Sequence, residues 1–299
     1  MRHNEIRLGR RAVLGALLAV PALVACGTDK GAPPPAPAPP GPDLAELERR
    51  YDARLGLHAT NVRTGRMLVN RPDERFALCS TFKTYAVAAL LRDHGLSSGY
   101  FDKVIRYTRD DLVSHSPVTE KHVDTGMTVR ELCEATMTVS DNTAANLLLR
   151  ERGGPGSIAP FARSIGDATT RLDRWETDLG TAIPGDERDT STPAGIAAGY
   201  RALVLGDALA APERDQLTNW LIANTTGDKT IRAGLPPTWR TGEKTGSGDY
   251  GTRNDVGVTW TEDGTPIVIA ILTSRPKQDD ERRDALLADT ARAVAAHLA

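Results

Sequence analysis

A serine and a lysine three residues apart are the first pair in this sequence that could do chemistry. Ser80 and Lys83 open an apolar stretch, residues 84–91. If Ser80 begins a helix, Lys83 lies on the same face, one turn later. The positive end of the helix dipole favours negative charge at the hydroxyl. Burial and the dipole disfavour the ammonium form of Lys83, so the amine can act as a base for a nucleophilic serine. The same spacing is also typical of a capped helix with a surface lysine.

Three later segments could complete such a site. Ser140-Asp141-Asn142 joins two predicted helices, Lys244-Thr245-Gly246 ends a predicted strand, and Glu176 lies in a long loop. Taken singly, they are a helix cap, a strand end with a turn glycine, and a surface carboxylate. Taken together and in this order, they are the S-x-x-K, S-D-N and K-T-G set of serine enzymes that act on β-lactams, with a glutamate as the water-activating base.

The combination resembles the class A serine β-lactamases over residues 43–299. The similarity extends beyond the short motifs. Residues 116–122 and 127–133 resemble the family's approach to S-D-N, residues 140–149 its S-D-N helix, and residues 184–190 the end of its Ω loop.

The resemblance implies catalytic roles. Ser80 attacks the β-lactam carbonyl and forms an acyl-enzyme, and Lys83 and Glu176 share the role of base. Ser140 relays a proton to the departing ring nitrogen. Glu176 then activates the water that hydrolyses the ester.

It also implies binding roles. The backbone N–H groups of Ser80 and Ser247 form the oxyanion hole, and Asn142 binds the substrate's side-chain amide. Arg174 and Asp189 resemble an ion pair that holds the loop; the alternative is two solvated charges of little energetic value. Lys244, Thr245 and Ser247 would hold the substrate carboxylate, and Gly246 belongs to the same substrate-binding segment. Arg253 would add positive potential there.

Several residues depart from the family pattern. Gly180 stands where an asparagine usually helps to hold the hydrolytic water, so we expect slower deacylation of bulky substrates. Thr177 replaces a frequent proline, and the family tends to keep a cis bond before this position. His115 replaces a frequent tyrosine at the gate, and we expect an exposed wall residue. Cys79 forms a disulfide in some members, but Gly248 occupies the partner position here.

The surrounding pattern predicts the elements that position these residues. Strands are expected at 55–62 and 66–70, and again at 239–244, 255–261 and 266–273, with mostly helices over 80–221 and at 279–297. This is an α/β fold of the α+β type: an antiparallel five-stranded sheet built from both chain ends and flanked by helices. The resemblance places the active site between this sheet and a helical subdomain. The aperiodic stretch 171–189 is typical of a packed, functional loop.

The N-terminus indicates export. Residues 1–25 combine Arg10-Arg11 with a short apolar run, which is typical of a twin-arginine signal peptide. Leu23 to Cys26 resembles a lipobox with Cys26 as the lipidated residue; the alternative is a plain secretory signal. Residues 26–42 are then a lipidated cysteine and a proline-rich tether, and residues 43–299 the catalytic domain.

Composition limits the other possibilities. A formal net charge of −2 without an internal basic block argues against nucleic acid. No cofactor is expected, and no metal, because no His/Cys/Asp cluster has ligand spacing. Cys79 and Cys133 are expected to be free and buried. We expect a monomer that acts on small-molecule β-lactams. It contacts the outer face of the cell membrane only through Cys26, and release of the protein from the membrane is left open. The alternatives are a penicillin-binding DD-peptidase and a non-hydrolysing β-lactam-binding lipoprotein.

Overall fold

A computed structural model describes residues 42–299 of the chain. The expected signal peptide, the lipobox at Cys26 and nearly all of the tether lie outside the described residues. No helix within residues 42–299 is both long enough and apolar enough to cross a membrane.

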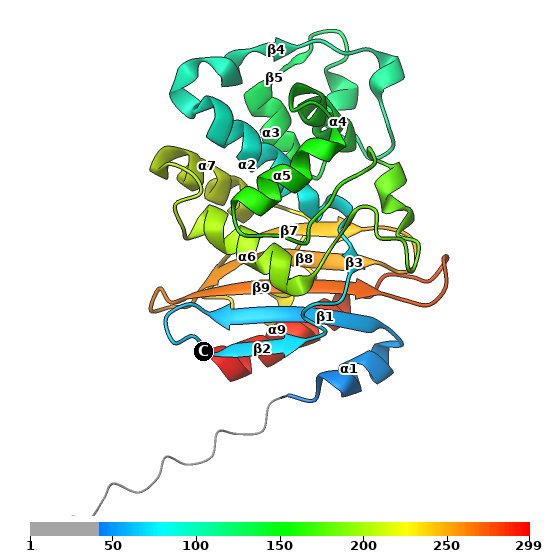
Figure 1. Cartoon of the computed structure of the whole chain (residues 1–299), viewed down its shortest axis with the longest axis vertical. Helices are drawn as coiled ribbons and strands as arrows, with labels where there is room; N and C mark the ends of the chain where they lie inside the picture. The colour runs from blue at the N-terminus through cyan, green and yellow to red at the C-terminus, as the bar shows by residue number, and fades with distance from the viewer. Residues whose placement is uncertain (1–41) are drawn as a thin grey trace, which may run out of the picture. The chain divides into compact units, whose positions relative to one another are not determined.

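The centre of the described chain is a five-stranded antiparallel sheet in the order β2-β1-β9-β8-β7 (Figure 1). The strands are β1 (Arg54–Asn61), β2 (Met67–Asn70), β7 (Arg240–Ser247), β8 (Arg253–Trp260) and β9 (Pro266–Ser274). Gly65 adopts positive φ in the turn between β1 and β2, and Gly264 does so in the turn between β8 and β9; glycine reaches this conformation without strain. The predicted sheet, built from both chain ends, is confirmed.

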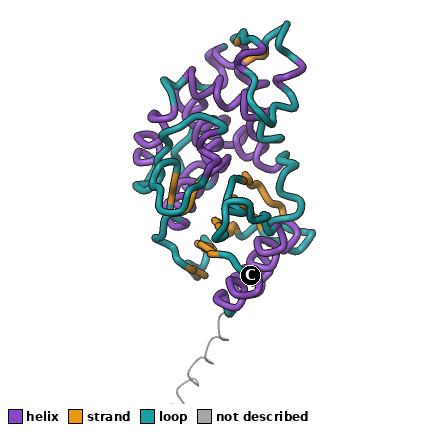
Figure 2. The backbone as a smooth tube through the Cα atoms, turned by 90° about the vertical axis from the view of Figure 1, so that its right-hand side faces the viewer, coloured by secondary structure: helices purple, strands orange, loops and turns teal. Residues whose placement is uncertain are grey.

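Helices cover both faces of this sheet. On one face, α1 (Leu44–Tyr51), α8 (Ile231–Gly234) and α9 (Asp284–Leu298) bury a smaller apolar core against β1 and β9. On the other, α6 (Pro193–Val204) packs on β1, β8 and β9. Figure 2 shows the C-terminal helix beside the strands.

The remaining helices form the mostly helical part above the sheet in Figure 1. They are α2 (Lys83–His94), α3 (Val129–Thr138), α4 (Asn142–Glu151), α5 (Ile158–Ser164) and α7 (Ala211–Ile222). Every residue of α2 from Lys83 to Leu91 is buried, which makes α2 the axis of the larger core. The predicted capping box begins α3: the Thr128 hydroxyl accepts from the Glu131 N–H, and the Glu131 carboxylate accepts from the Thr128 N–H.

Short elements complete the fold. The two-residue strands β3 (Phe76–Ala77) and β6 (Thr190–Ser191) pair with each other, as do β4 (Val104–Ile105) and β5 (Met127–Thr128). The sequence does not predict them, because two residues carry no period. The 3₁₀ turns are Cys79–Phe82, Leu96–Ser98, Tyr100–Asp102, Arg109–Asp111, Thr119–Lys121, Pro155–Ser157 and Asp178–Thr181.

Two predicted helix starts are wrong. Ser80 lies in a 3₁₀ turn, and the α-helix begins only at Lys83. The C-terminal helix begins at Asp284 rather than at residue 279. Asp280 explains that delay, since its carboxylate accepts the Lys277 N–H at 2.8 Å and lies 3.2 Å from Arg275, holding residues 277–280 in a turn.

Candidate active site

The nucleophile candidate lies where the chain passes from the sheet into α2. Cys79 has φ of +45°, an unusual conformation for a residue with a side chain. Ser80 follows it in the tight 3₁₀ turn, partly exposed. Its Oγ donates a hydrogen bond to Glu176 Oε1 at 3.0 Å. The structure therefore places the serine in direct contact with the carboxylate expected to act as a base.

Lys83 is completely buried beneath this serine. Its Nζ lies 3.1 Å from Glu176 Oε1 and donates to Asn142 Oδ1 at 2.6 Å and to the Ser140 carbonyl at 2.8 Å. Burial lowers the pKa of the Lys83 ammonium below its usual value, and the Glu176 carboxylate opposes that shift. Lys83 therefore loses its proton, and becomes a neutral amine, more readily than a surface lysine does.

Ser140 joins the two lysines of the site. It adopts φ of +60°, and its Oγ accepts from Lys83 Nζ at 3.2 Å and from Lys244 Nζ at 3.0 Å. Burial, and then the positive charge of Lys83, lower the pKa of Lys244 well below its usual value. A hydroxyl between two amines is suited to passing a proton from one side of the cleft to the other.

Glu176 is held by its backbone. Asn146 on α4 donates to the Glu176 carbonyl at 2.8 Å and accepts the Glu176 N–H at 3.0 Å. The bond between Glu176 and Thr177 is cis, which the sequence left open. Sequence reasoning did not assign Asn146 a role, although it lies in the quoted S-D-N helix.

The loop carrying Glu176 is closed by a buried ion pair. Arg174 Nε lies 2.5 Å from Asp189 Oδ2, and Asp189 is wholly buried. The other Asp189 oxygen accepts the N–H groups of Asp173 and Arg174 at 2.7 and 2.9 Å. The Asp189 carbonyl accepts the Leu78 N–H at 2.8 Å, which joins the loop to the segment before Ser80. The alternative of two solvated charges does not describe this pair.

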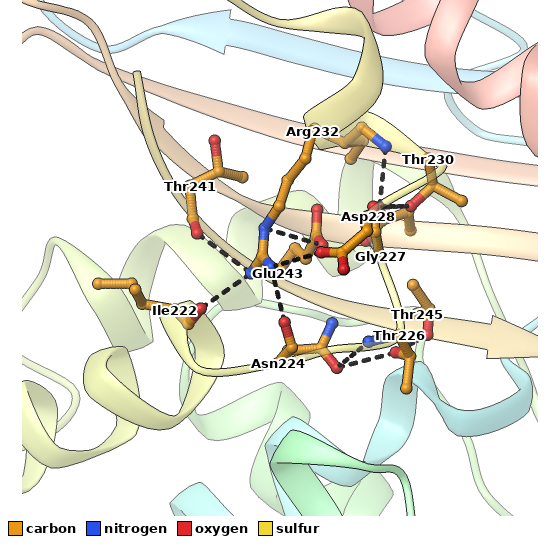
Figure 3. A network of polar contacts seen from close by, with 12 residues as sticks. Ile222, Asn224, Thr226, Gly227, Asp228, Thr230, Arg232, Thr241, Glu243 and Thr245 are labelled. Carbon is orange, nitrogen blue, oxygen red and sulfur yellow. Dashed lines mark hydrogen bonds and ion pairs between the residues drawn. The ribbon is translucent and has the colours of Figure 1, made fainter. Parts of the chain in front are cut away.

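Arg253 reaches the end of β7 from the neighbouring strand. Its Nη1 donates to Ser247 Oγ at 3.0 Å, its Nη2 to the Thr226 carbonyl at 3.1 Å, and its Nε contacts Asp284 at 2.6 Å. The hydroxyl of Thr226 is in turn hydrogen-bonded to that of Thr245 (Figure 3). Sequence reasoning missed Thr226, because it lies in a loop with no motif.

Gly246 brings β7 against the nucleophile. A Cβ at this position would lie 2.8 Å from the Leu78 carbonyl oxygen and 3.2 Å from Ser80 N, so a glycine permits the close approach. Gly248 is likewise close to Cys79: its Cβ would lie 2.8 Å from Sγ. Among the described residues Cys79 and Cys133 are free and buried, as expected.

A cavity of about 700 Å³ collects most of these residues. Its wall includes the exposed His115, whose Nε2 contacts the Val139 carbonyl at 3.0 Å. The other expected site residues that line it are Ser80, Ser140, Asn142, Glu176, Gly180, Thr245, Gly246, Ser247 and Arg253. A larger cavity of about 960 Å³ lies behind the 182–190 part of the loop, but none of those residues lines it. The cavity of about 700 Å³ is therefore the candidate active site.

Comparison with known proteins decides the family. The model of the β-lactamase enzyme family matches residues 40–298. The chain is 54% identical over 297 residues to β-lactamase FAR-1 of Nocardia farcinica (strain IFM 10152), covering 96% of this chain and 95% of that protein. The chain belongs to the class A β-lactamases. It is also 60% identical over 253 residues to β-lactamase AST-1 of Nocardia asteroides, covering 85% of this chain and 82% of that one. A solved β-lactamase structure from Streptomyces albus G matches with a TM-score of 0.84 at 49% identity, covering 86% of this chain and 98% of that one.

The predicted family and fold are thereby confirmed, and the protein is a β-lactamase rather than a DD-peptidase or a binding protein. In residues 42–299 no group of three or more His, Cys, Asp or Glu side chains could hold a metal ion.

Proposed function

We propose that this β-lactamase opens the β-lactam ring through an acyl-enzyme on Ser80, which a Glu176-activated water then hydrolyses. One observation carries the proposal: Ser80 Oγ and Lys83 Nζ both lie within 3.1 Å of the same Glu176 oxygen. A nucleophile and an amine that both contact one carboxylate provide the groups needed to deprotonate the serine and to activate the hydrolytic water.

Acylation begins with loss of the Ser80 proton. Glu176 accepts the Ser80 hydrogen bond directly, and burial lowers the pKa of Lys83, so both can share this role. The attacking oxygen adds to the carbonyl carbon and gives a tetrahedral oxyanion. When this oxyanion collapses to the ester, the C–N bond of the ring breaks. Ser140, in contact with Lys83 and Lys244, delivers the proton that the ring nitrogen takes up.

The binding residues fix the substrate during this step. The N–H groups of Ser80 and Ser247 would stabilise the oxyanion, since fixed dipoles need no reorganisation during the reaction. Lys244, Thr245 and Arg253 would hold the substrate carboxylate at the end of β7, together with Gly246 and Ser247. Asn142 would bind the side-chain amide. A carboxylate facing the Arg253 guanidinium gains a strong, charge-assisted hydrogen bond.

The first experiment is turnover of a chromogenic cephalosporin by the purified protein lacking residues 1–25. We expect hydrolysis in the wild type, and none in Ser80→Ala, because the nucleophile is gone. The control is Cys133→Ala, whose thiol lies in the helical core outside the cavity. Hydrolysis by folded Ser80→Ala at the wild-type rate would reject the assignment of the nucleophile.

A second prediction concerns the missing asparagine. No described atom lies within 4 Å of a Cβ built at Gly180, and the position lines the same cavity as Glu176. In Gly180→Asn the new amide can hold the hydrolytic water, and a hydrogen bond of about 1 kcal/mol corresponds to roughly five-fold faster deacylation. Single-turnover deacylation rates with a bulky cephalosporin measure it. Gly180→Ala is the matched control, and an equal gain in both variants would contradict the role of the amide.

We also propose that residues 1–25 form a twin-arginine export signal and that Cys26 is lipidated. The lipid would anchor the protein at the outer face of the cell membrane. Residues 26–42 would be the tether, and residues 43–299 a monomeric catalytic domain. The support is Arg10-Arg11 and the segment Leu23 to Cys26. In Cys26→Ser we expect activity to move from the membrane fraction to the soluble exported fraction. Unchanged membrane association would instead favour a different anchor.

A further inference from the structure

A second cavity lies behind the loop that carries Glu176. It has a volume of about 960 Å³, and we call it the rear cavity. Its walls come from α1, from the start of β1, from β3, from the end of β9 and from residues 182–188 of the loop. It shares no lining residue with the candidate active site. A cavity of this volume can hold a drug-sized organic molecule.

The charged side chains of the rear cavity are almost all paired with one another. Four carboxylates each lie within 3.4 Å of an arginine of the same wall: Glu48 with Arg71, Glu74 with Arg54, Asp186 with Arg188, and Asp52 with Arg275. Arg49 pairs with Glu46 at 2.5 Å, outside the cavity. Only Arg75 and the exposed Glu187 have no ion-pair partner among residues 42–299. The wall therefore holds one arginine whose charge is not neutralised.

Arg75 uses only one of its three side-chain nitrogen atoms. Its Nη1 donates to the Thr169 carbonyl and to Thr190 Oγ1, both at 3.0 Å. Its Nε and Nη2 have no hydrogen-bond or ion-pair partner in the described part of the chain. These two atoms form an edge of the guanidinium that can bind a carboxylate through two parallel hydrogen bonds. Arg75 can therefore hold an anion without giving up its contacts to the loop.

A buried hydroxyl group on the same wall also lacks a partner. Thr252 lines the rear cavity and is 1% exposed. Its Oγ1 has no hydrogen-bond partner within residues 42–299. Leaving such a group unpaired is costly. A polar atom of a bound molecule would satisfy this hydroxyl, which no neighbouring side chain does.

The loop side of the rear cavity is apolar. Ala182, Ile183 and Pro184 line it, together with Phe76 from β3. Ile183 is 47% exposed, so a large apolar side chain is left in water. Covering it with an apolar group is favourable. One unmatched cation beside apolar surface fits an organic molecule with a single negative charge, and fits inorganic phosphate poorly because phosphate would cover no apolar surface.

Arg75 also connects the rear cavity to the loop that holds Glu176. Thr169 precedes this loop and Thr190 follows it, so the two hydrogen bonds of Arg75 join its two ends. Thr190 Oγ1 in turn donates to the Glu187 carbonyl at 2.6 Å. A molecule bound to Arg75 and Ile183 would contact both the ends and the wall of the loop, and should resist its opening.

We propose that the rear cavity is a binding site for a small organic monoanion, with its carboxylate on Arg75 and its apolar body on Ile183. The bound molecule stabilises the closed loop of residues 171–189 from behind. The inference goes beyond the proposed function and does not depend on it, because no residue assigned to catalysis lines this cavity.

Fluorescence of 8-anilinonaphthalene-1-sulfonate, an apolar molecule with one negative charge, reports binding to the purified protein. We expect one saturable site with a Kd on the order of 10⁻⁵–10⁻⁴ M. Decanoate should displace this probe about tenfold better than decanol, which lacks the charge, or acetate, which lacks the apolar body. A folded wild type without saturable binding, or equal displacement by decanoate and decanol, would overturn the proposal.

Matched variants locate the anion on one arginine. Arg75→Gln should weaken binding of the probe about tenfold, because a charged hydrogen-bond donor is lost. Arg49→Gln removes the same charge from the same wall, but this arginine is already paired, so Kd should stay within about two-fold of wild type. Equal losses in the two variants would mean that the probe responds only to total charge.

Ile183→Ser tests the apolar half of the site. This side chain is exposed, so the variant should fold, and binding should weaken about fivefold. It keeps the proposal testable if Arg75→Gln does not fold. Wild-type affinity in Ile183→Ser would remove the loop from the site.

Two measurements separate the rear cavity from the candidate active site. Bound decanoate should slow hydrogen exchange within residues 182–190 and leave KM for a chromogenic cephalosporin unchanged. A raised KM without slower exchange would place the anion among the catalytic residues and overturn the inference. If the wild type did not hydrolyse the cephalosporin, the proposed function would fail, whereas the binding and exchange measurements would still decide this one.

Discussion

Glu176→Ala should accumulate a covalent adduct on Ser80 and lose 10²–10⁴-fold in kcat, about the contribution of a positioned general base. The adduct should weigh as much as the whole penicillin, since opening a ring expels no leaving group. The physical reason is that Lys83 remains in the variant beside Ser80 and Ser140, so acylation retains a base. Nothing else in the site replaces the carboxylate that must activate water. Intact-protein mass spectrometry during turnover measures the adduct.

The controls separate the two halves of the reaction. Glu187→Ala removes an exposed carboxylate from the same loop and should behave as wild type. Ser80→Ala combined with Glu176→Ala should show no adduct. Wild-type turnover in Glu176→Ala would reject Glu176 as the base for deacylation. A folded variant with neither turnover nor adduct would instead assign acylation to Glu176 as well.

The chemistry-bearing residues could be predicted because each lies in a short motif of restricted sequence. Ser80, Ser140 and Lys244 come from three segments far apart in the chain, and the structure joins them through Lys83 and Glu176. The five strands could be predicted from β-branched runs and turn glycines. Their order could be inferred only as one sheet formed from both chain ends, because pairing depends on contacts across more than 200 residues.

The residues that hold the site in place could not be predicted. Asn146 donates to the backbone carbonyl of Glu176, and Thr226 accepts from Arg253 through its own backbone carbonyl; such contacts leave no mark in a sequence. The turn at Ser80 also differs from the predicted helix start. Residues 79–82 form a 3₁₀ turn that packs against the sheet, and the α-helix begins after it.

Asp189→Ala should release the loop that carries Glu176. The carboxylate is wholly buried and accepts Arg174 Nε and two backbone N–H groups. Removing one partner of a buried ion pair costs about 3–5 kcal/mol, because the other charge and its donors are left without a partner. We expect this cost to appear mainly as local opening of residues 173–189, since the sheet and α2 do not depend on the carboxylate.

The kinetic consequence follows from where the other site residues lie. Ser80, Lys83 and Lys244 belong to other elements, so acylation should continue while Glu176 is displaced. Asp189→Ala should therefore accumulate an acyl-enzyme on Ser80, as Glu176→Ala does, and hydrogen exchange should accelerate within residues 173–189. Both effects would be measured on the same preparation, by mass spectrometry of the intact and the digested protein.

Two comparisons make the result specific to the ion pair. Asp189→Asn keeps acceptors for the N–H groups but loses the charge, so its loss of deacylation should be smaller than in Asp189→Ala. Arg188→Ala breaks a solvent-exposed pair with Asp186 on the same loop and should change neither exchange nor turnover. Since Arg174 and Asp189 are in contact, Arg174→Ala combined with Asp189→Ala should cost less than the two single variants together. Strict additivity, or wild-type deacylation in Asp189→Ala, would mean that the ion pair does not hold Glu176 in place.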